Sequence, residues 1–455
     1  MDTMAALRHE RRASSLRIGA TMTRTQFIAL CAISLVAMHI QSSGPEPGHL
    51  TPAGDANATS AVLSPAHFAP EFMGIHTLSP ARHWPSVPFG AMRPAGVSWA
   101  ALEPAKGQYD WRSLDFWVSQ AHSHGVQLDY LFLNTPRWAS TRPDEPCNGK
   151  RMGCAAPPDM SDWANFVTAL VTRFKGRIAS YELWNEPNAS AYWSGTPQQM
   201  ADMAARAYPI IKSIDPDAIV ASPSASSNGW PMPHDVWLDE YLSAGGGKYS
   251  DAIAWHGYAG RNDRPALPPE DLARQIQALR IVLARHRLSQ LPIWDTEGGW
   301  GKNDQLPDPG DQAAFVARWY LIQFSSGIAR AYWYQWDNPD WGTLWREGAG
   351  PTPAGAAYEQ IYNWLSDVTA VAPCHALPHS TLWICDLQKG NAPYRVAWST
   401  SGQASFPAID GVISYTEIGA AKQNPAGRPV MVGPRPILFE LKPAPSTQSG
   451  SGAAR

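Results

Sequence analysis

The sequence is poor in charged residues. Only 16% of its 455 residues are Asp, Glu, Lys or Arg, against about 25% in an ordinary globular chain. The 36 basic and 39 acidic side chains leave a formal net charge of −3. Because no basic excess attracts a polyanion, the composition argues against nucleic acid or an anionic membrane surface as a partner.

Long apolar runs are also missing. The longest candidate, residues 27–40, has 14 residues, fewer than the roughly 20 of a membrane-spanning helix. Arginines precede it, which is typical of a signal-peptide core. We therefore expect an export segment over residues 1–43, starting at Met1 or Met22 and either cleaved or retained as an anchor. Residues 44–69, rich in Pro, Gly, Ala and Ser, are expected to form a disordered linker.

Cysteine is scarce, with five residues in all. Cys31 falls in the expected export segment, and the other four form two close pairs, Cys147 with Cys154 and Cys374 with Cys385. In a secreted or periplasmic chain such pairs indicate disulfides, and four buried thiols are the alternative.

Strand and helix patterns alternate between residues 70 and 370. Eight short apolar runs predict strands at 72–78, 91–97, 126–133, 178–184, 218–222, 252–258, 291–296 and 329–336. Helical periodicity with capping signals predicts helices at 110–124, 161–175, 196–213, 234–243, 270–287, 311–325 and 354–365, with Asp110, Ser161 and Thr196 as N-caps. Eight such units fit an α/β fold, the (β/α)8 TIM barrel. Only residues 79–90, with three prolines, join the first two strands, so a reduced helix or a loop is expected there.

The pattern changes after residue 370. Short strands at 382–385, 395–399 and 436–441 are separated by Gly, Pro and Asn turns. We expect a small β-sandwich-like domain over 371–442 and a disordered tail over 443–455.

Two glutamates stand where strands of the predicted barrel end. The fourth strand leads into Trp184-Asn185-Glu186-Pro187, and the seventh ends at Glu297 before two glycines. Active sites of this fold lie at the carboxyl ends of the strands. Glycoside hydrolysis needs two such carboxyl groups, one to protonate the leaving oxygen and one to attack the anomeric carbon or activate water.

The motif Trp184-Asn185-Glu186-Pro187, with Glu297 on a later strand, resembles the retaining glycoside hydrolases of clan A. The similarity is greatest to family 39, especially its bacterial exopolysaccharide-hydrolase-like members, with family 5 next. Further motifs of this style follow in order from about residue 72 to 340: Arg93, Trp99-x-x-x-Glu103-Pro104, Gly107-x-Tyr109-Asp110-Trp111, Thr135-Pro136-x-Trp138-Ala139, His256-x-Tyr258, and Tyr332-Trp333-Tyr334 with Trp336-Asp337.

The resemblance implies a role for each matching residue. Glu186 would be the general acid/base and Glu297 the nucleophile. Asn185 would bind the sugar 2-hydroxyl, Arg93 would keep Glu297 ionised, and Tyr258 would orient it. The sugar cleft would be lined by His76, Trp138, His256 and Trp336. Each also has a structural alternative: Arg93 could pair with Glu103 or Glu182, and the histidines and tryptophans could be core residues.

The predicted function is hydrolysis of O-glycosidic bonds in an oligo- or polysaccharide, such as a bacterial exopolysaccharide, by double displacement. No cofactor and no metal are expected. A non-catalytic carbohydrate-binding barrel and a transglycosidase with the same residues are alternatives. A metal hydrolase would have to use His76, His256, Asp295 and Glu297, without the clustered His motifs typical of such sites.

Overall fold

The computed structural model describes residues 66–78, 83–147, 151–229, 231–260, 265–406, 411–424 and 429–443. The export segment expected over 1–43, residues 44–65 of the linker and residues 444–455 of the tail lie outside this part of the chain. None of the helices within it combines the length and the apolar character needed to cross a membrane.

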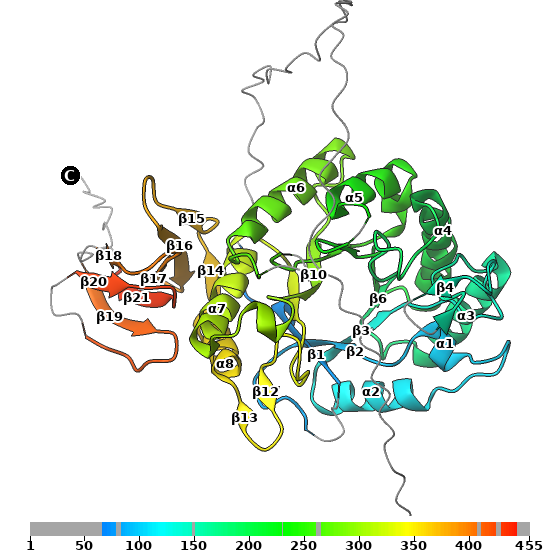
Figure 1. The fold of residues 1–455 in the computed structure, drawn as a ribbon, viewed down its shortest axis with the longest axis horizontal. Helices are drawn as coiled ribbons and strands as arrows, with labels where there is room; N and C mark the ends of the chain where they lie inside the picture. The colour runs from blue at the N-terminus through cyan, green and yellow to red at the C-terminus, as the bar shows by residue number, and fades with distance from the viewer. Residues whose placement is uncertain are drawn as a thin grey trace, which may run out of the picture. The chain divides into compact units, whose positions relative to one another are not determined.

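Parallel strands form the centre of the larger domain (Figure 1). They run in the order β7-β6-β3-β2-β1-β11-β10-β9-β8. Their bounds are β1 (Met73–Thr77), β2 (Ala91–Pro94), β3 (Gln127–Leu131), β6 (Ser180–Glu182), β7 (Ile219–Ala221), β8 (Ala225–Ser226), β9 (Ile253–His256), β10 (Ile293–Gly298) and β11 (Arg330–Trp333). Nearly every strand residue is buried, as expected for strands covered on both faces.

The fifth strand of the predicted barrel is split into β7 and β8 around Pro223. β7 pairs with β6, and β8 pairs with β9. Parallel bridges Asn185↔Ser224 and Ala221↔Ala252 continue both pairings across the split. These contacts close the ring, so the sheet is the predicted eight-stranded barrel with one interrupted strand.

Helices surround the strands (Figure 1). They are α1 (Trp99–Leu102), α2 (Arg112–Ser123), α3 (Met160–Phe174), α4 (Pro197–Ile214), α5 (His234–Ser243), α6 (Asp271–Arg285), α7 (Pro309–Ser325) and α8 (Pro353–Leu365). α4 begins as predicted: Thr196 accepts from the Gln199 N–H in a capping box, and Pro197 takes the first helical position.

Two predicted N-caps are wrong. The cap of α3 is Asp159, whose carboxylate accepts the N–H groups of Ser161 and Asp162. A carboxylate two residues upstream reaches both free N–H groups, so Ser161 falls inside the helix. The cap of α2 is Trp111, and the Asp110 carboxylate instead accepts from the N–H of Arg112, two residues further along the chain. The first connection has no helix over its described residues 83–90, in agreement with the prediction of a loop.

Strands of the C-terminal region form a sheet of their own, drawn from tan to red in Figure 1. Its order is β14-β16-β17-β21-β19, with β15 beside β16, and β18 and β20 form a separate pair. The bounds are β14 (Val368–Ala370), β15 (His375–Ala376), β16 (Leu382–Lys389), β17 (Ala392–Ser399), β18 (Ala404–Phe406), β19 (Val412–Glu417), β20 (Val430–Val432) and β21 (Ile437–Leu441). Since β14 pairs with β16, the sheet takes in three residues before the expected boundary at 371.

Both expected cysteine pairs are disulfides. Cys147–Cys154 links β4 (Pro146–Cys147) to the loop that follows β5 (Arg151–Met152). Cys374–Cys385 joins β16 to the segment before β15. Two disulfides fit a protein that works outside the reducing cytoplasm.

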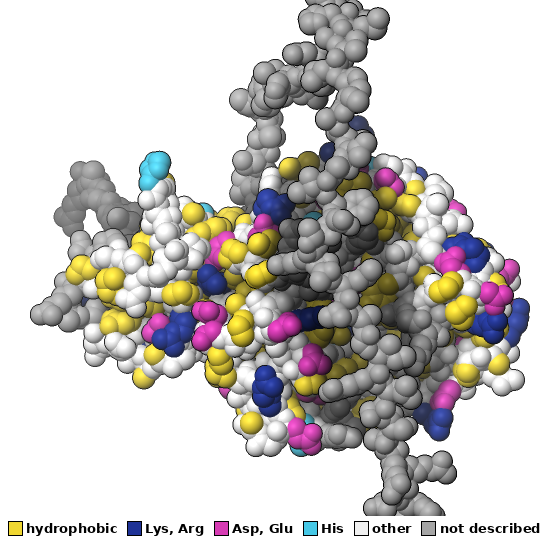
Figure 2. All heavy atoms as spheres, viewed as in Figure 1, with side chains coloured by type: hydrophobic (Ala, Val, Ile, Leu, Met, Phe, Trp, Pro, Cys, Tyr) yellow, Lys and Arg dark blue, Asp and Glu magenta, His cyan; other side chains and the backbone are white. Residues whose placement is uncertain are grey.

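Tryptophan contributes mainly to the core. Thirteen of the 21 tryptophans are buried in the part of the chain that the structure describes, so packing rather than a binding surface explains most of this residue's abundance. On the face drawn in Figure 2, acidic and basic side chains of the described residues are interspersed, without a large patch of one sign.

Candidate active site

Glu186 is placed by the loop that follows β6. Its N–H donates to the Ser224 carbonyl at 2.9 Å, and its backbone has a φ of 42°, in the left-handed region. A non-glycine residue in this conformation is strained and is found more often at functional sites than elsewhere. Asn188 holds the same loop, because its amide nitrogen donates to the carbonyls of Ser226 and Met232 and its oxygen accepts the Ser226 N–H.

Glu297 lies near the end of β10 and is held by two donors. The Arg93 guanidinium donates to Oε2 at 2.9 Å, and the Tyr258 hydroxyl donates to Oε1 at 2.7 Å. Burial raises the pKa of Tyr258 well above its ordinary value, so the hydroxyl keeps its proton. Both bonds hold the carboxylate in one orientation, as a nucleophile requires.

Arg93 connects three parts of the site from inside the barrel. Its side chain is 2% exposed. Besides Glu297 it donates to Glu182 at 2.9 Å and to the amide oxygen of Asn185 at 3.1 Å. The last bond fixes the orientation of Asn185 and leaves its amide nitrogen as the available donor. Arg93 therefore makes both of the contacts considered from the sequence, one with Glu182 and one with Glu297.

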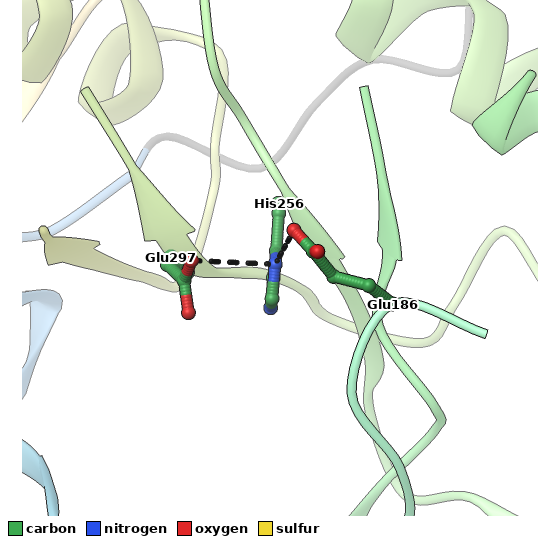
Figure 3. Close-up of side chains that lie close together, drawn as sticks. All are labelled: Glu186, His256 and Glu297. Carbon is green, nitrogen blue, oxygen red and sulfur yellow. Dashed lines mark hydrogen bonds and ion pairs between the residues drawn. The ribbon is translucent and has the colours of Figure 1, made fainter. Parts of the chain in front are cut away.

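His256, at the end of β9, lies between the two glutamates (Figure 3). Its Nδ1 is 3.0 Å from Oε1 of Glu186 and 3.9 Å from Oε1 of Glu297. Burial lowers the pKa of His256 to about 3, so the ring is neutral at physiological pH. Burial also raises the pKa of Glu186, which favours the protonated form that an acid catalyst needs.

A cavity of about 320 Å³ opens over these carboxylates. It is lined by Glu186, Ala189, Ser190, Ala191, Tyr192, Asn228, Gly229, Tyr258, Glu297, Tyr334 and Trp341. Oxygen atoms of Glu186 and Glu297 lie within 4.8 Å of each other at its base. Within this lining the only charged side chains are the two glutamates.

None of the four residues expected to line the sugar cleft belongs to this lining, and His256 is fully buried beside Glu186. His76 is 6% exposed and bonds through Nε2 to the Thr296 carbonyl at 2.8 Å, with burial lowering its pKa. Trp138 lies on a separate groove of about 580 Å³, where its indole donates to the Glu103 carbonyl. Trp336 is 1% exposed and packs in the core. His76, Trp138, His256 and Trp336 thus all lie outside the lining of this cavity, whereas the sequence placed them in the sugar cleft.

Aromatic residues from loops replace Trp336 in the cavity. Tyr334 and Tyr258 each meet Trp341 edge to face, with ring centroids 6.2 Å apart. Tyr192 lies on the loop after Glu186, and its carbonyl accepts from the Trp184 indole. The sequence signal for Tyr334 was its place in the aromatic run at the end of the eighth strand. Tyr192 and Trp341 carry no motif that separates them from other loop aromatics.

A metal ion could find three ligand atoms here. The facing atoms of Glu186, His256 and Glu297 all lie within 4.8 Å of one another. However, both oxygens of Glu297 already accept bonds, and the Arg93 charge opposes a second cation. Asp295, which the metal-hydrolase alternative requires, instead accepts from the Gly257 N–H and from the Gln323 amide on α7. The donor set fits proton transfer better than metal binding.

Comparison with known proteins supports this interpretation. No protein family model matches the chain. A β-xylosidase of Geobacillus stearothermophilus is 24% identical over 188 residues, a match that spans 36% of this chain and 36% of that protein. The chain thus covers about a third of this curated relative.

Solved structures share the fold over most of the chain. A family 39 glycoside hydrolase from Bacteroides cellulosilyticus has a TM-score of 0.63 and 20% identity, over 82% of this chain and 81% of that one. A family 39 β-xylosidase from Caulobacter crescentus has a TM-score of 0.58 and 15% identity, over 84% and 98%. The resemblance predicted from the motifs is therefore confirmed: in fold, and over part of its sequence, this chain is similar to the glycoside hydrolases of family 39.

Proposed function

We propose that this chain is a retaining glycosidase in which Glu297 is the nucleophile and Glu186 the general acid/base. One observation carries the proposal: the facing oxygens of Glu186 and Glu297 lie within 4.8 Å across an open cavity. Retaining enzymes hold their carboxyl groups about 5–5.5 Å apart, whereas inverting enzymes need roughly 6.5–9.5 Å to admit a water.

The reaction would proceed in two displacements. Glu297, held by Arg93 and Tyr258, attacks the anomeric carbon while the protonated Glu186 gives its proton to the leaving oxygen. Glu186 then removes a proton from the incoming water, which attacks the glycosyl–Glu297 ester and releases the sugar with retained configuration. The amide nitrogen of Asn185 would donate to the sugar 2-hydroxyl.

The substrate would be a neutral sugar. A substrate anion would meet two carboxyl groups and no lysine or arginine in the described cavity lining, and Arg93 is already shared between two carboxylates. Tyr258, Tyr334 and Trp341 offer apolar ring surfaces on which a sugar ring could lie. β-Xylosides, named for the relatives, and neutral bacterial exopolysaccharides are the first substrates to test, for an enzyme exported to the periplasm or the medium.

The test compares wild type with Glu186→Gln and Glu297→Gln on aryl β-glycosides, β-linked oligosaccharides and exopolysaccharides. We expect wild type to turn over the substrate and both variants to be much slower. NMR of the first-formed product should show the retained anomer. An inverted first product, or undiminished turnover by either variant, would overturn the assignment. Binding without turnover by wild type would support a carbohydrate-binding protein instead.

A further inference from the structure

A second pair of carboxyl groups lies inside the barrel, and the proposed reaction does not use it. Asp129 is on β3 and Glu182 on β6, and both are fully buried. In the register of these strands Leu131 is level with Glu182. Since side chains alternate along a strand, Asp129 shares the face of Leu131 and points to the same side as Glu182. The two side chains lie within hydrogen-bonding range of each other, and this contact lowers the pKa of Asp129.

The pair is short of hydrogen-bond donors. Oε1 of Glu182 accepts from Arg93 and from the Ser224 hydroxyl. Oε2 of Glu182 and both oxygens of Asp129 are buried and accept no hydrogen bond in good geometry among the described residues. The hydroxyls of Ser180, beside Asp129, and of Thr296, beside Glu182, are the neutral donors close enough to act on the pair. If both carboxyl groups were ionised, they would repel each other in this interior of low dielectric constant. Burying a charge without a partner also costs free energy.

The charges around the pair balance only if it holds a proton. The charged or titratable groups that interact with it are Arg93, His256, Arg330 and Tyr332. Arg93 interacts in turn with Glu297, Glu186 and His76, and Arg330 with the partly exposed Glu71. The two histidines are neutral, because burial lowers the pKa of each. Burial raises the pKa of Glu186, which is taken as protonated here. Two guanidinium groups therefore face three further buried carboxyl groups (Asp129, Glu182 and Glu297), and one proton on the pair makes the charges equal.

We propose that Asp129 and Glu182 share one proton at neutral pH, and that Glu182 acts as a positioning residue that divides Arg93 between the barrel interior and Glu297. With the proton in place, the pair attracts Arg93 no more strongly than Glu297 does, and the guanidinium can hold both. Without it, two negative charges would draw Arg93 away from the nucleophile. The effect on Glu297 rests on the proposed function, whereas the shared proton does not.

The protonation energetics point the same way. Burial, opposed by Arg93 and aided by the neighbouring Asp129, raises the pKa of Glu182 to about 8. Burial raises the pKa of Asp129 as well. Both shifts favour a proton on the pair at pH 7.

Infrared spectroscopy tests the proton directly. Asp129→Asn keeps the side-chain volume and leaves Glu182 to ionise beside Arg93. We expect the spectrum at pH 7 to lose one carboxylic-acid C=O band relative to wild type. An unchanged set of bands would overturn the proposal. If Asp129→Asn does not fold, Glu182→Gln provides the same test, because it removes the other partner of the shared proton.

The pH profile of kcat/KM tests the positioning role. Glu182→Gln replaces the carboxylate that binds Arg93 directly by a neutral amide and leaves the single charge of the pair on Asp129, for which no hydrogen bond to Arg93 is found. More of the Arg93 charge then acts on Glu297, which should stay ionised to lower pH. We expect the acidic limb to move down by about one pH unit, the order of shift that one nearby charge causes. Ser224→Ala is the matched control, since it removes a neutral donor from the same oxygen of Glu182, and its limb should stay in place.

A uniform loss of activity at every pH, with the limb unmoved, would give Glu182 a purely structural role and overturn this part. If wild type proves to have no glycosidase activity, no profile exists, but the infrared result still decides whether the pair shares a proton. The two failures are therefore distinguishable.

Discussion

The hydrogen bond from Tyr258 to the proposed nucleophile can be removed without changing the shape of the site. Its hydroxyl lies 2.7 Å from Oε1 of Glu297, and the side chain is 4% exposed. Tyr258→Phe deletes only the oxygen and keeps the ring, including its edge-to-face contact with Trp341. Glu297 would then be held by Arg93 alone and could turn about its terminal bond.

The size of the effect follows from the charge on the acceptor. A hydrogen bond to an ionised group is worth about 1.5–3 kcal/mol. If the transition state loses this stabilisation, kcat/KM should fall roughly 10- to 150-fold, since each 1.36 kcal/mol changes the rate tenfold. Because burial raises the pKa of Tyr258 well above its ordinary value, the bond persists at neutral and mildly alkaline pH, and the loss should appear throughout that range.

The assay is kcat/KM on the best aryl glycoside, with thermal unfolding measured in parallel. Tyr241→Phe is the control: this tyrosine is also buried, and its hydroxyl contacts the Gly246 carbonyl at 3.3 Å and the Ser250 side chain, none of which lines the cavity. We expect the control to keep its rate. Equal rates for Tyr258→Phe and the control would refute the reasoning. A faster Tyr258→Phe would show that the bond mainly stabilises the resting carboxylate.

Three further predictions concern the acid, the loop that carries it and a disulfide. Glu186→Gln should slow substrates with poor leaving groups by about 10²–10⁴-fold, and activated aryl glycosides much less, since only the former need a proton. Because burial raises the pKa of Glu186, wild-type activity should fall on the alkaline side as this proton is lost, and a pH profile of the variant should lack that limb. Gly229→Ala should abolish most activity in steady-state assays. The new Cβ would lie 1.9 Å from the amide nitrogen of Asn188, whose hydrogen bonds hold the loop of Glu186. Normal activity would show that Asn188 is not needed to position this loop. Replacing Cys147 and Cys154 by Ser should lower the free energy of unfolding by about 2.5 kcal/mol, from the chain entropy of a loop with separation 7, as measured by denaturant titration; an unchanged midpoint would contradict it.

The sequence by itself determined the barrel and the two glutamates. Strands buried on both faces appear as short apolar runs, and helices begin at Thr196-Pro197 and similar local signals, so no long-range information is needed to find them. Parallel strands carry their ends to one face of a barrel, which is why Glu186 and Glu297, distant in sequence, could be expected to meet. The cysteine pairs were predictable because their members lie only seven and eleven positions apart in the sequence.

Only the tertiary structure decided which other side chains reach the cavity. Tyr192 and Trp341 lie on loops whose paths depend on contacts with distant parts of the chain, while Trp336, nearer to the strand, packs inward. The pairing of Asp129 with Glu182 likewise depends on the register between β3 and β6, which the sequence does not state. Local patterns determine where a strand starts and ends; barrel closure and strand register determine which side chains share the space inside it.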